Sequence, residues 1–157
     1  MPGPSIQEGD ERRMTRRIEV EVEGAKAEFE LRDDLAPQTT AALWESLPIE
    51  TSIRHGKLSG SACYLDVEHG PIAGIAAEPE LPVTSIYKGW IVAFPAPSMG
   101  FTELLISYGV AEYRWPTGRK LVTPVAELQG DGAALFDALG RTHSEGEKSV
   151  AIRRRGE

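Results

Sequence analysis

The chain has little cysteine and no long apolar run, and both scarcities exclude classes of protein. Cys63 is the single cysteine among 157 residues, so no disulfide can form within the chain and a reducing compartment is expected. No window approaches the roughly 20 apolar residues that a membrane-spanning helix needs. The start, MPGPSIQEGDERR, lacks the apolar core of a secretory signal. We therefore expect a cytoplasmic protein without membrane contact, as a monomer or a small homo-oligomer.

Several motifs of catalysis and cofactor binding are also missing. The histidines, His55, His69 and His143, lie far apart and show no spacing typical of a metal site. There is no phosphate-binding loop, no dinucleotide fingerprint and no Gly-x-Ser-x-Gly elbow. We therefore expect no metal and no other cofactor.

Positive charge is also in short supply. Lys and Arg total 17 against 24 Asp and Glu, which gives a net charge of 17 − 24 = −7. This balance argues against nucleic acid as a partner. The length fits one domain with a substantial core. Residues 1–14 show no periodicity, so we expect a flexible N-terminal tail followed by a single domain over residues 15–157.

The clearest pattern lies in residues 17–48. Apolar residues alternate with charged ones over 18–22 and again over 25–31, on either side of Gly24. This period of two predicts a β-hairpin with one buried face. Apolar side chains then recur at helical spacing, with Pro37 suited to the first turn and Pro48 as the stop.

The rest of the chain reads mainly as further strands. A second short helix is expected over residues 132–139, with Gly140 as its stop. The further strands are expected at 49–53, 61–67, 90–94, 104–108, 120–128 and 148–153. About eight strands with two short helices and no βαβ rhythm predict a mainly β protein: a closed or nearly closed antiparallel β-barrel filled by its own side chains.

Some blocks of sequence resemble the cyclophilin-like fold. The segment after the first hairpin carries an acidic residue, Ala-Pro, threonines and an aromatic ahead of a leucine, in LRDDLAPQTTAALWESLP. Residues 54–65 (RHGKLSGSACYL), 88–95 (KGWIVAFP) and 102–109 (TELLISYG) are similar to bacterial cyclophilin-like domains of unknown function. The resemblance covers roughly residues 17–153, and it implies a cyclophilin-like barrel.

The same resemblance implies less about activity. True cyclophilins carry a Phe-His-Arg motif after the first helix, and its arginine polarises the prolyl peptide bond. This chain has Arg54-His55 there, in reverse order and in a glycine-rich turn. We therefore expect no prolyl isomerase activity.

Two pairs of polar residues are candidates for a ligand site at the barrel rim. Arg54 and His55 would bind an anion or a carboxylate, or else form an ordinary solvated turn. Glu103 with Tyr108 would serve as a base or hold a ligand amine, or else Glu103 is an exposed edge charge. Cys63 reads as a buried, inert thiol rather than a nucleophile.

A third candidate is the aromatic and cationic cluster of Tyr113, Trp115 and Arg119. Such clusters anchor ligands, and they also occur as hairpin packing. The preferred hypothesis is a module that binds a small polar metabolite or a peptide segment at a rim cleft. The alternative is an enzyme that acts on a small carboxylate or amide through Glu103 with Arg54 or Arg119. Both hypotheses require these residues to converge on one opening.

Overall fold

A hairpin of β1 (Arg17–Val22) and β2 (Ala25–Leu31) begins the barrel of the computed structural model, which describes residues 15–75 and 78–155. The predicted tail, residues 1–14, lies outside the described residues. The apolar row of β1 is fully buried, and its glutamates are half-buried. Glu23 and Gly24 both have positive φ, at 51° and 79°, which is the conformation of a tight two-residue hairpin turn. The predicted hairpin is confirmed.

The remaining elements follow in an order rich in strands, and all the strand pairs are antiparallel. They are α2 (Pro37–Ser46), β3 (Ile49–His55), β4 (Gly60–Val67), α3 (Gly70–Ala73), β5 (Ser85–Ile86), β6 (Trp90–Ala96), a 3₁₀ turn (Pro97–Met99), β7 (Phe101–Glu112), β8 (Arg114–Trp115), β9 (Gly118–Arg119), β10 (Thr123–Gln129), α4 (Ala133–Glu145) and β11 (Lys148–Arg154).

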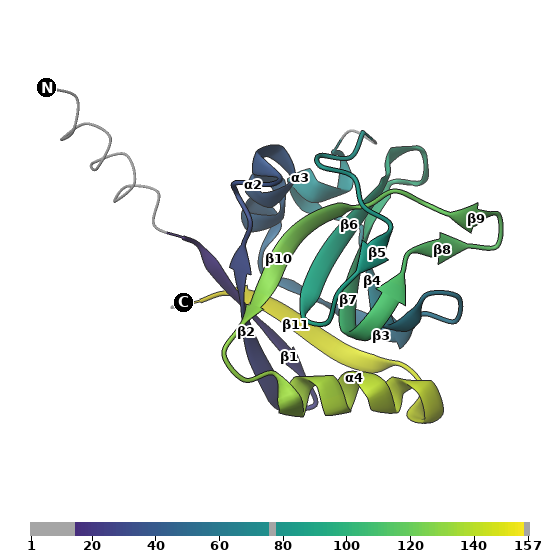
Figure 1. Cartoon of the computed structure of the whole chain (residues 1–157). Coiled ribbons are helices and arrows are strands. Elements are labelled where there is room, and N and C mark those ends of the chain that lie inside the picture. The colour runs from purple at the N-terminus through teal and green to yellow at the C-terminus, as the bar shows by residue number, and fades with distance from the viewer. Residues whose placement is uncertain (1–14, 76–77, 156–157) are drawn as a thin grey trace, which may run out of the picture.

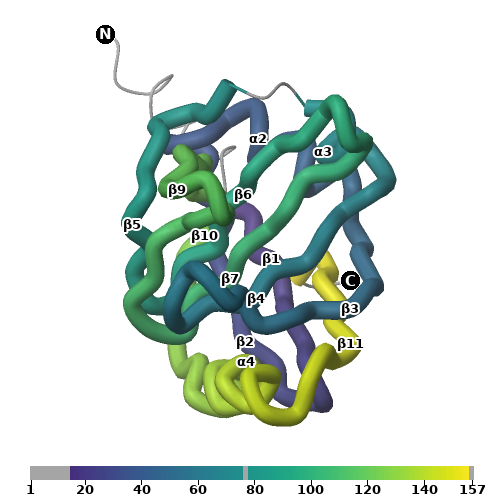
Figure 2. The backbone as a smooth tube through the Cα atoms, turned by 90° about the vertical axis from the view of Figure 1, so that its right-hand side faces the viewer, coloured from purple at the N-terminus to yellow at the C-terminus, as the bar shows by residue number. Residues whose placement is uncertain are grey.

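Eight strands close into a barrel, as the sequence predicts. The order is β4-β3-β11-β1-β2-β10-β6-β7, and β7 pairs again with β4. Figure 2 shows β3, β4 and β7 side by side on the wall nearest the viewer. β5 adds two residues to the far end of β7, and β8 and β9 form a separate two-stranded ribbon. The long β7 therefore joins the barrel wall to the structure outside it.

Helices cover both ends of the barrel. Helix α4 lies below it, and α2 and α3 lie above it in Figures 1 and 2. The two expected helices are α2 and α4, and α3 is a third short helix in a stretch expected to be a loop. The predicted stop at Gly140 is wrong, because α4 continues to Glu145. Gly140 lies within α4 beside the Tyr108 ring, which would be in ordinary van der Waals contact, at 3.5 Å, with an added Cβ.

Apolar side chains are buried on both faces of the wall made by β4, β6 and β7. Ile91 and Ile106 point into the barrel core, whereas Val92 and Leu105 belong to a second cluster outside it. The three central residues of the strand predicted at 90–94 are accordingly all buried. Segments around β5, β8 and Tyr113 cover this outer cluster. The candidate site lies at the edge of the region that these segments cover.

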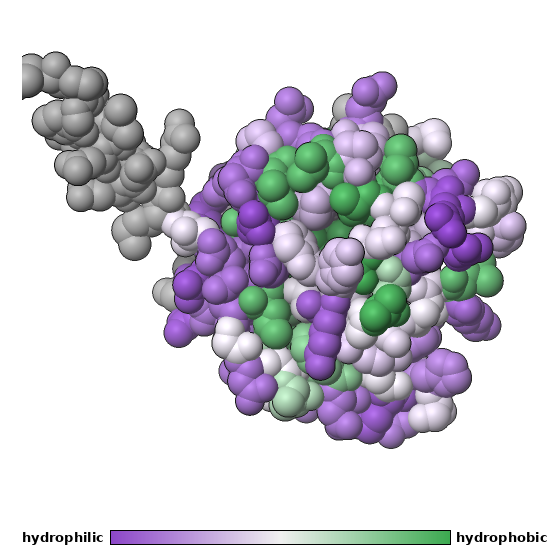
Figure 3. Space-filling view, viewed as in Figure 1, coloured by the Kyte–Doolittle hydropathy of each residue, from purple (hydrophilic) through white to green (hydrophobic). Residues whose placement is uncertain are grey.

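The surface outside the site is mixed in character. Figure 3 shows apolar residues reaching the surface in the upper middle of the face, around β5 and β6, and mostly polar ones around α4. Within the described residues, no helix combines the length and the apolar character needed to cross a membrane.

Candidate functional site

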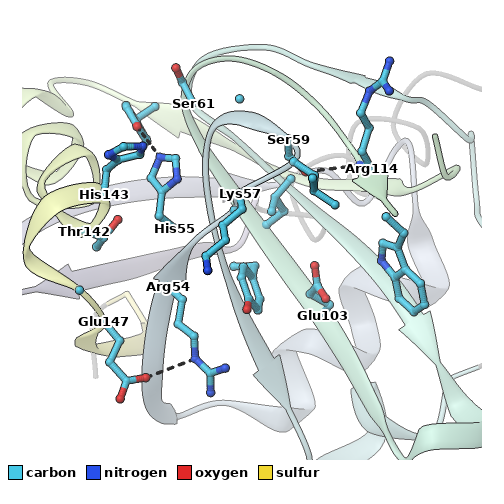
Figure 4. A pocket seen from close by; sticks show the side chains of 18 of the residues that line it. Arg54, His55, Lys57, Ser59, Ser61, Glu103, Arg114, Thr142, His143 and Glu147 are labelled. Atoms are coloured by element: carbon cyan, nitrogen blue, oxygen red, sulfur yellow. Dashed lines mark hydrogen bonds and ion pairs between the residues drawn. The ribbon is translucent and has the colours of Figure 1, made fainter. Parts of the chain in front are cut away.

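A groove of about 1420 Å³ opens around the turn between β3 and β4. Its walls come from the end of β3, the turn itself, β4, β7, the β8 ribbon and the last turn of α4 (Figure 4). Its lining side chains carry both signs of charge, together with hydroxyl groups and aromatic rings. They include Arg54, His55, Lys57, Ser59, Ser61, Tyr64, Glu103, Tyr108, Arg114, Trp115, Thr142, His143 and Glu147.

The groove joins two regions on opposite faces of the barrel wall. In the β3–β4–β7 register, Arg54 pairs with Tyr64, which pairs with Leu105 of the outer cluster. His55 pairs with Cys63 of the inner core. Side chains alternate between faces along a strand, so Arg54 belongs to the outer wall and His55 to the barrel mouth. The β3–β4 turn between them gives the groove access to both regions.

Glu103 is the principal acidic group of the outer wall. It pairs with Asp66 on β4 and with Phe94 on β6. Its Oε1 accepts a hydrogen bond from the Tyr113 hydroxyl at 2.9 Å. Burial raises the pKa of Glu103 to about 7; the hydrogen bond from Tyr113 opposes this shift, and the charge of Asp66 adds to it. Glu103 is therefore a half-buried carboxyl group that titrates near neutral pH.

The hydrogen bonds behind Glu103 run in one direction. The Trp115 indole Nε1 donates to the Tyr113 hydroxyl oxygen at 2.9 Å. An indole N–H can only donate, so the Tyr113 hydroxyl oxygen accepts a hydrogen bond from Trp115. The Tyr113 O–H in turn donates a hydrogen bond to Glu103. Tyr113 is 1% exposed, and Phe94 stacks on its ring at a centroid distance of 5.0 Å. This relay fixes Oε1 as an acceptor and leaves Oε2 without a donor among the described residues.

Asp66 lies beside Glu103 and reaches a second, smaller pocket of about 290 Å³. Its Oδ1 is shielded from solvent and has no hydrogen-bond partner in the described structure. Burial raises the pKa of Asp66; the nearby Arg54 charge opposes the shift, and Glu68 adds to it. Arg54 and Tyr64 line both pockets, so the carboxyl pair lies where the two pockets meet.

Arg54 lies at the rim and is already paired. Its Nε is 3.2 Å from Glu147 Oε2, and its guanidinium carbon is 6.0 Å from the Tyr64 ring centroid. More than half of its side chain is exposed. A solvated pair of this kind contributes little to stability, so the guanidinium can exchange Glu147 for a ligand anion at small cost.

The barrel mouth holds a compact cluster of His55, Tyr108 and His143. His55 Nε2 lies 2.7 Å from the Tyr108 hydroxyl, and the two imidazole rings meet edge to face at 4.9 Å. Burial lowers the pKa of His55, and the nearby His143 lowers it further. A neutral His55 can then accept a hydrogen bond from the Tyr108 hydroxyl at Nε2. The cluster presents His143 and Thr142 to the groove.

Cys63 is buried behind this cluster, as the sequence predicts. Its sulfur lies 3.3 Å from the Leu139 carbonyl oxygen and 3.2 Å from Thr142 Oγ1. Burial raises the thiol pKa to about 11, although the Thr142 hydroxyl opposes the shift. A thiol in this state is a poor nucleophile.

The structure brings five of the seven predicted site residues to the groove lining: Arg54, His55, Glu103, Tyr108 and Trp115. Tyr113 lies behind the wall and contacts the groove residues Glu103 and Trp115 through its hydroxyl group. Arg119 points elsewhere, because Glu112 holds its Nε at 2.9 Å on the ribbon.

Sequence reasoning missed Asp66, Tyr64 and His143. The alternation of SACYLDV carries a signal for the first two, since it places Tyr64 and Asp66 together on one face. Nothing in the sequence connects His143 to His55, because their proximity depends on how α4 packs against the barrel. Among the described residues, no group of three or more His, Cys, Asp or Glu side chains is placed to hold a metal ion.

A family model described as "Protein of unknown function (DUF3830)" matches residues 18–152. The match supports the expectation of a family of unknown function. It leaves the cyclophilin-like and bacterial parts of the resemblance as predictions. No curated protein matches the sequence significantly.

Two solved structures share the fold. The structure of McbB in complex with tryptophan matches with a TM-score of 0.70 at 22% identity, over 89% of this chain and 45% of the McbB chain. This chain thus spans less than half the length of that neighbour. The solution structure of the hypothetical protein AF2241 from Archaeoglobus fulgidus matches with a TM-score of 0.55 at 16% identity, over 89% of this chain and 95% of AF2241. At these identities the likeness shows the fold alone.

Proposed function

Because the chain belongs to the DUF3830 family, whose function is unknown, we propose its function from the groove itself: it binds a small polar organic molecule. The observation that carries the proposal is the convergence of Arg54, Glu103 and Trp115 on one concave surface. Binding sites combine a shaped apolar wall with a few convergent polar groups. McbB, which shares the fold, is seen in complex with tryptophan, a small molecule with charges of both signs.

The polar groups suit a ligand with both charged and apolar parts. Glu103 offers a carboxyl oxygen at the outer wall, while Arg54, Lys57 and Arg114 place cationic groups around the same opening (Figure 4). Trp115 supplies an aromatic surface in the same groove lining. A metabolite or the end of a peptide segment fits an open groove of this size. We also propose that the protein lacks prolyl isomerase activity, as no Phe-His-Arg motif is present.

The experiment is a fragment screen by ¹H–¹⁵N NMR on the full chain. The library contains amino acids, amines, carboxylates and short peptides. We expect hits to shift backbone resonances of the 54–61 turn, of Glu103 and of Trp115. Glu103→Gln is expected to weaken the charged hits. Glu45→Gln is a matched control, because Glu45 is an exposed α2 carboxylate near Arg154. Shifts confined to other surfaces, or none across the library, would refute the proposal.

The second candidate function is an enzyme that uses Glu103 to move a proton on a small carboxylate or amide. It is favoured by one observation, the pKa of Glu103 at about 7, since a general acid or base works best near the ambient pH. In the groove, Arg54 is one of the cations that could orient such a substrate. Turnover of a hit, followed by mass spectrometry and abolished in Glu103→Gln with binding retained, would establish this function. Full retention of turnover in that variant would exclude Glu103 as the catalytic residue.

A further inference from the structure

We infer that the paired carboxyl groups of Asp66 and Glu103 bind a protonated amine, with the apolar body of the ligand against the aromatic wall of the groove. The inference rests on the proposed function and names the class of its ligand. It follows from four features: the strand register, the direction of the hydrogen bonds from Trp115 through Tyr113 to Glu103, the ion pairs that the neighbouring arginines already form, and the position of the aromatic rings.

The register places the two carboxyl groups side by side. Asp66 and Glu103 are direct partners across the antiparallel β4–β7 pair, and such partners have Cβ atoms roughly 5 Å apart. Two like charges at this separation repel each other, and they share the outer face with the buried Leu105. The arrangement is unfavourable unless a proton or another cation lies between them.

The relay leaves two oxygens available to such a cation. Tyr113 occupies Oε1 of Glu103, so Oε2 is the atom that remains for a ligand. Oδ1 of Asp66 is shielded from water and unpartnered in the described structure, and a buried polar atom without a partner is costly. An ammonium group has three donors and no acceptor, so one group can satisfy both oxygens together.

The cations nearest the pair are bound to other carboxylates. The Arg54 Nε lies against Glu147 at 3.2 Å. Arg114 and Arg119 both contact Glu112, at 3.7 Å and 2.9 Å. No described lysine or arginine forms an ion pair with Asp66 or Glu103. Arg54 acts on Asp66 only through its nearby charge, and Lys57 also lines the groove. Neither forms an ion pair with the two carboxyl groups, so a proton or a ligand cation can take that place.

Aromatic residues lie on the same outer face as the carboxyl pair. Tyr64 precedes Asp66 by two residues on the same outer face of β4. Phe94 pairs with Glu103 and lies 5.2 Å from the Trp115 ring. Ammonium groups are attracted to aromatic faces, and the rings also provide an apolar surface. This combination favours an amine carried on an aromatic or apolar body over a strongly hydrated inorganic cation.

The test uses three probes with one indole body and different end groups: tryptamine, tryptophol and indole-3-acetate. Their affinities are measured by NMR titration with the wild-type chain, Asp66→Asn, Glu103→Gln and the control Glu45→Gln. Tryptamine is expected to bind at least tenfold tighter than tryptophol, and indole-3-acetate most weakly. Asp66→Asn and Glu103→Gln are each expected to remove most of the amine preference, while Glu45→Gln retains it.

Equal affinity of tryptamine and tryptophol for the wild-type groove would overturn the inference and leave the proposed function intact. The same holds if both groove variants fold and retain the amine preference. The comparison of tryptamine with tryptophol on the wild-type chain tests the inference even if a variant fails to fold. Absence of tryptamine binding at the groove also overturns the inference, whereas the proposed function falls only if the broad library finds no groove ligand.

Discussion

The Tyr113 hydroxyl donates to Oε1 of Glu103 across 2.9 Å while it accepts from the Trp115 indole. This contact links a fully buried side chain to a carboxyl group on the groove wall. It opposes the effect of burial on the Glu103 pKa. The protonation state of Glu103 therefore depends on Tyr113, a buried side chain that a ligand in the groove does not contact.

Tyr113→Phe is expected to raise the pKa of Glu103 above its value of about 7, because the removed hydrogen bond favours the charged carboxylate. A ¹³C NMR titration of the Glu103 carboxyl carbon measures this shift directly. Tyr87→Phe is the control, since Tyr87 is 70% exposed. An unchanged or lower Glu103 pKa in Tyr113→Phe would mean that the hydrogen bond does not control the groove carboxyl.

Glu103→Gln is expected to make stability less dependent on pH. The folded pKa of Glu103, about 7, lies above its unfolded value near 4.3. The folded state thus binds more protons between these values, and this group lowers stability as the pH rises from about 4 to 7. Glutamine carries no charge, so the variant should gain up to about 3–4 kcal/mol over the wild type above pH 7 and nothing below pH 4. Urea unfolding below pH 4 and at pH 8 measures the difference in stability between the variant and the wild type. A variant less stable than the wild type at pH 8 would contradict the prediction.

Glu80 caps helix α2 from a distant loop. Its Oε1 accepts from the Thr39 amide at 2.7 Å and from the Thr39 hydroxyl at 2.8 Å, and its Oε2 accepts from the Gln38 amide at 3.2 Å. Ala36, at the cap position, has no side-chain cap of its own. Glu80→Ala should therefore cost about 1–2 kcal/mol of unfolding free energy, measured by urea titration. The exposed Glu78→Ala, two residues away, should cost under about 0.5 kcal/mol. Equal effects of the two variants would exclude the cap.

Substitution of Phe29 tests the packing of the barrel core that supports the site. It is fully buried in the barrel interior, so Phe29→Ala should destabilise the protein by about 3–5 kcal/mol through the cavity it leaves. Val110→Ala serves as the surface control, because Val110 is 82% exposed. A loss under about 1 kcal/mol in urea unfolding would place Phe29 outside the cooperative core.

The barrel could be predicted because the alternation that specifies its strands is a local pattern of the sequence. Alternation of apolar and charged residues in 18–22 and 25–31 fixes which face is buried, whatever the strand's partners. Within the predicted strand 120–128, Pro124 cannot donate a backbone hydrogen bond, and the β10–β6 register shifts between Pro124 and Ala126. The end of α4 was missed because Gly140 reads as a stop, whereas the helix continues through it to Glu145.

The site was only partly predictable for the same reason. Glu103 attracted notice as a charge beside a buried run, but its partner Asp66 is identified only by the β4–β7 register. Arg119 and Trp115 are close in sequence, yet the turn of the ribbon sends Arg119 to Glu112 and Trp115 to the groove. Pairing between distant strands, not composition, decides which charges meet.

The most direct measurement of the central claim is a crystal structure of the full chain soaked with a groove ligand found by NMR. The account predicts density in the groove, with a polar atom of the ligand within hydrogen-bond distance of Glu103 Oε2 and its apolar part against Trp115. Density at another surface, with the groove empty at a saturating concentration of a compound that binds in solution, would contradict the account.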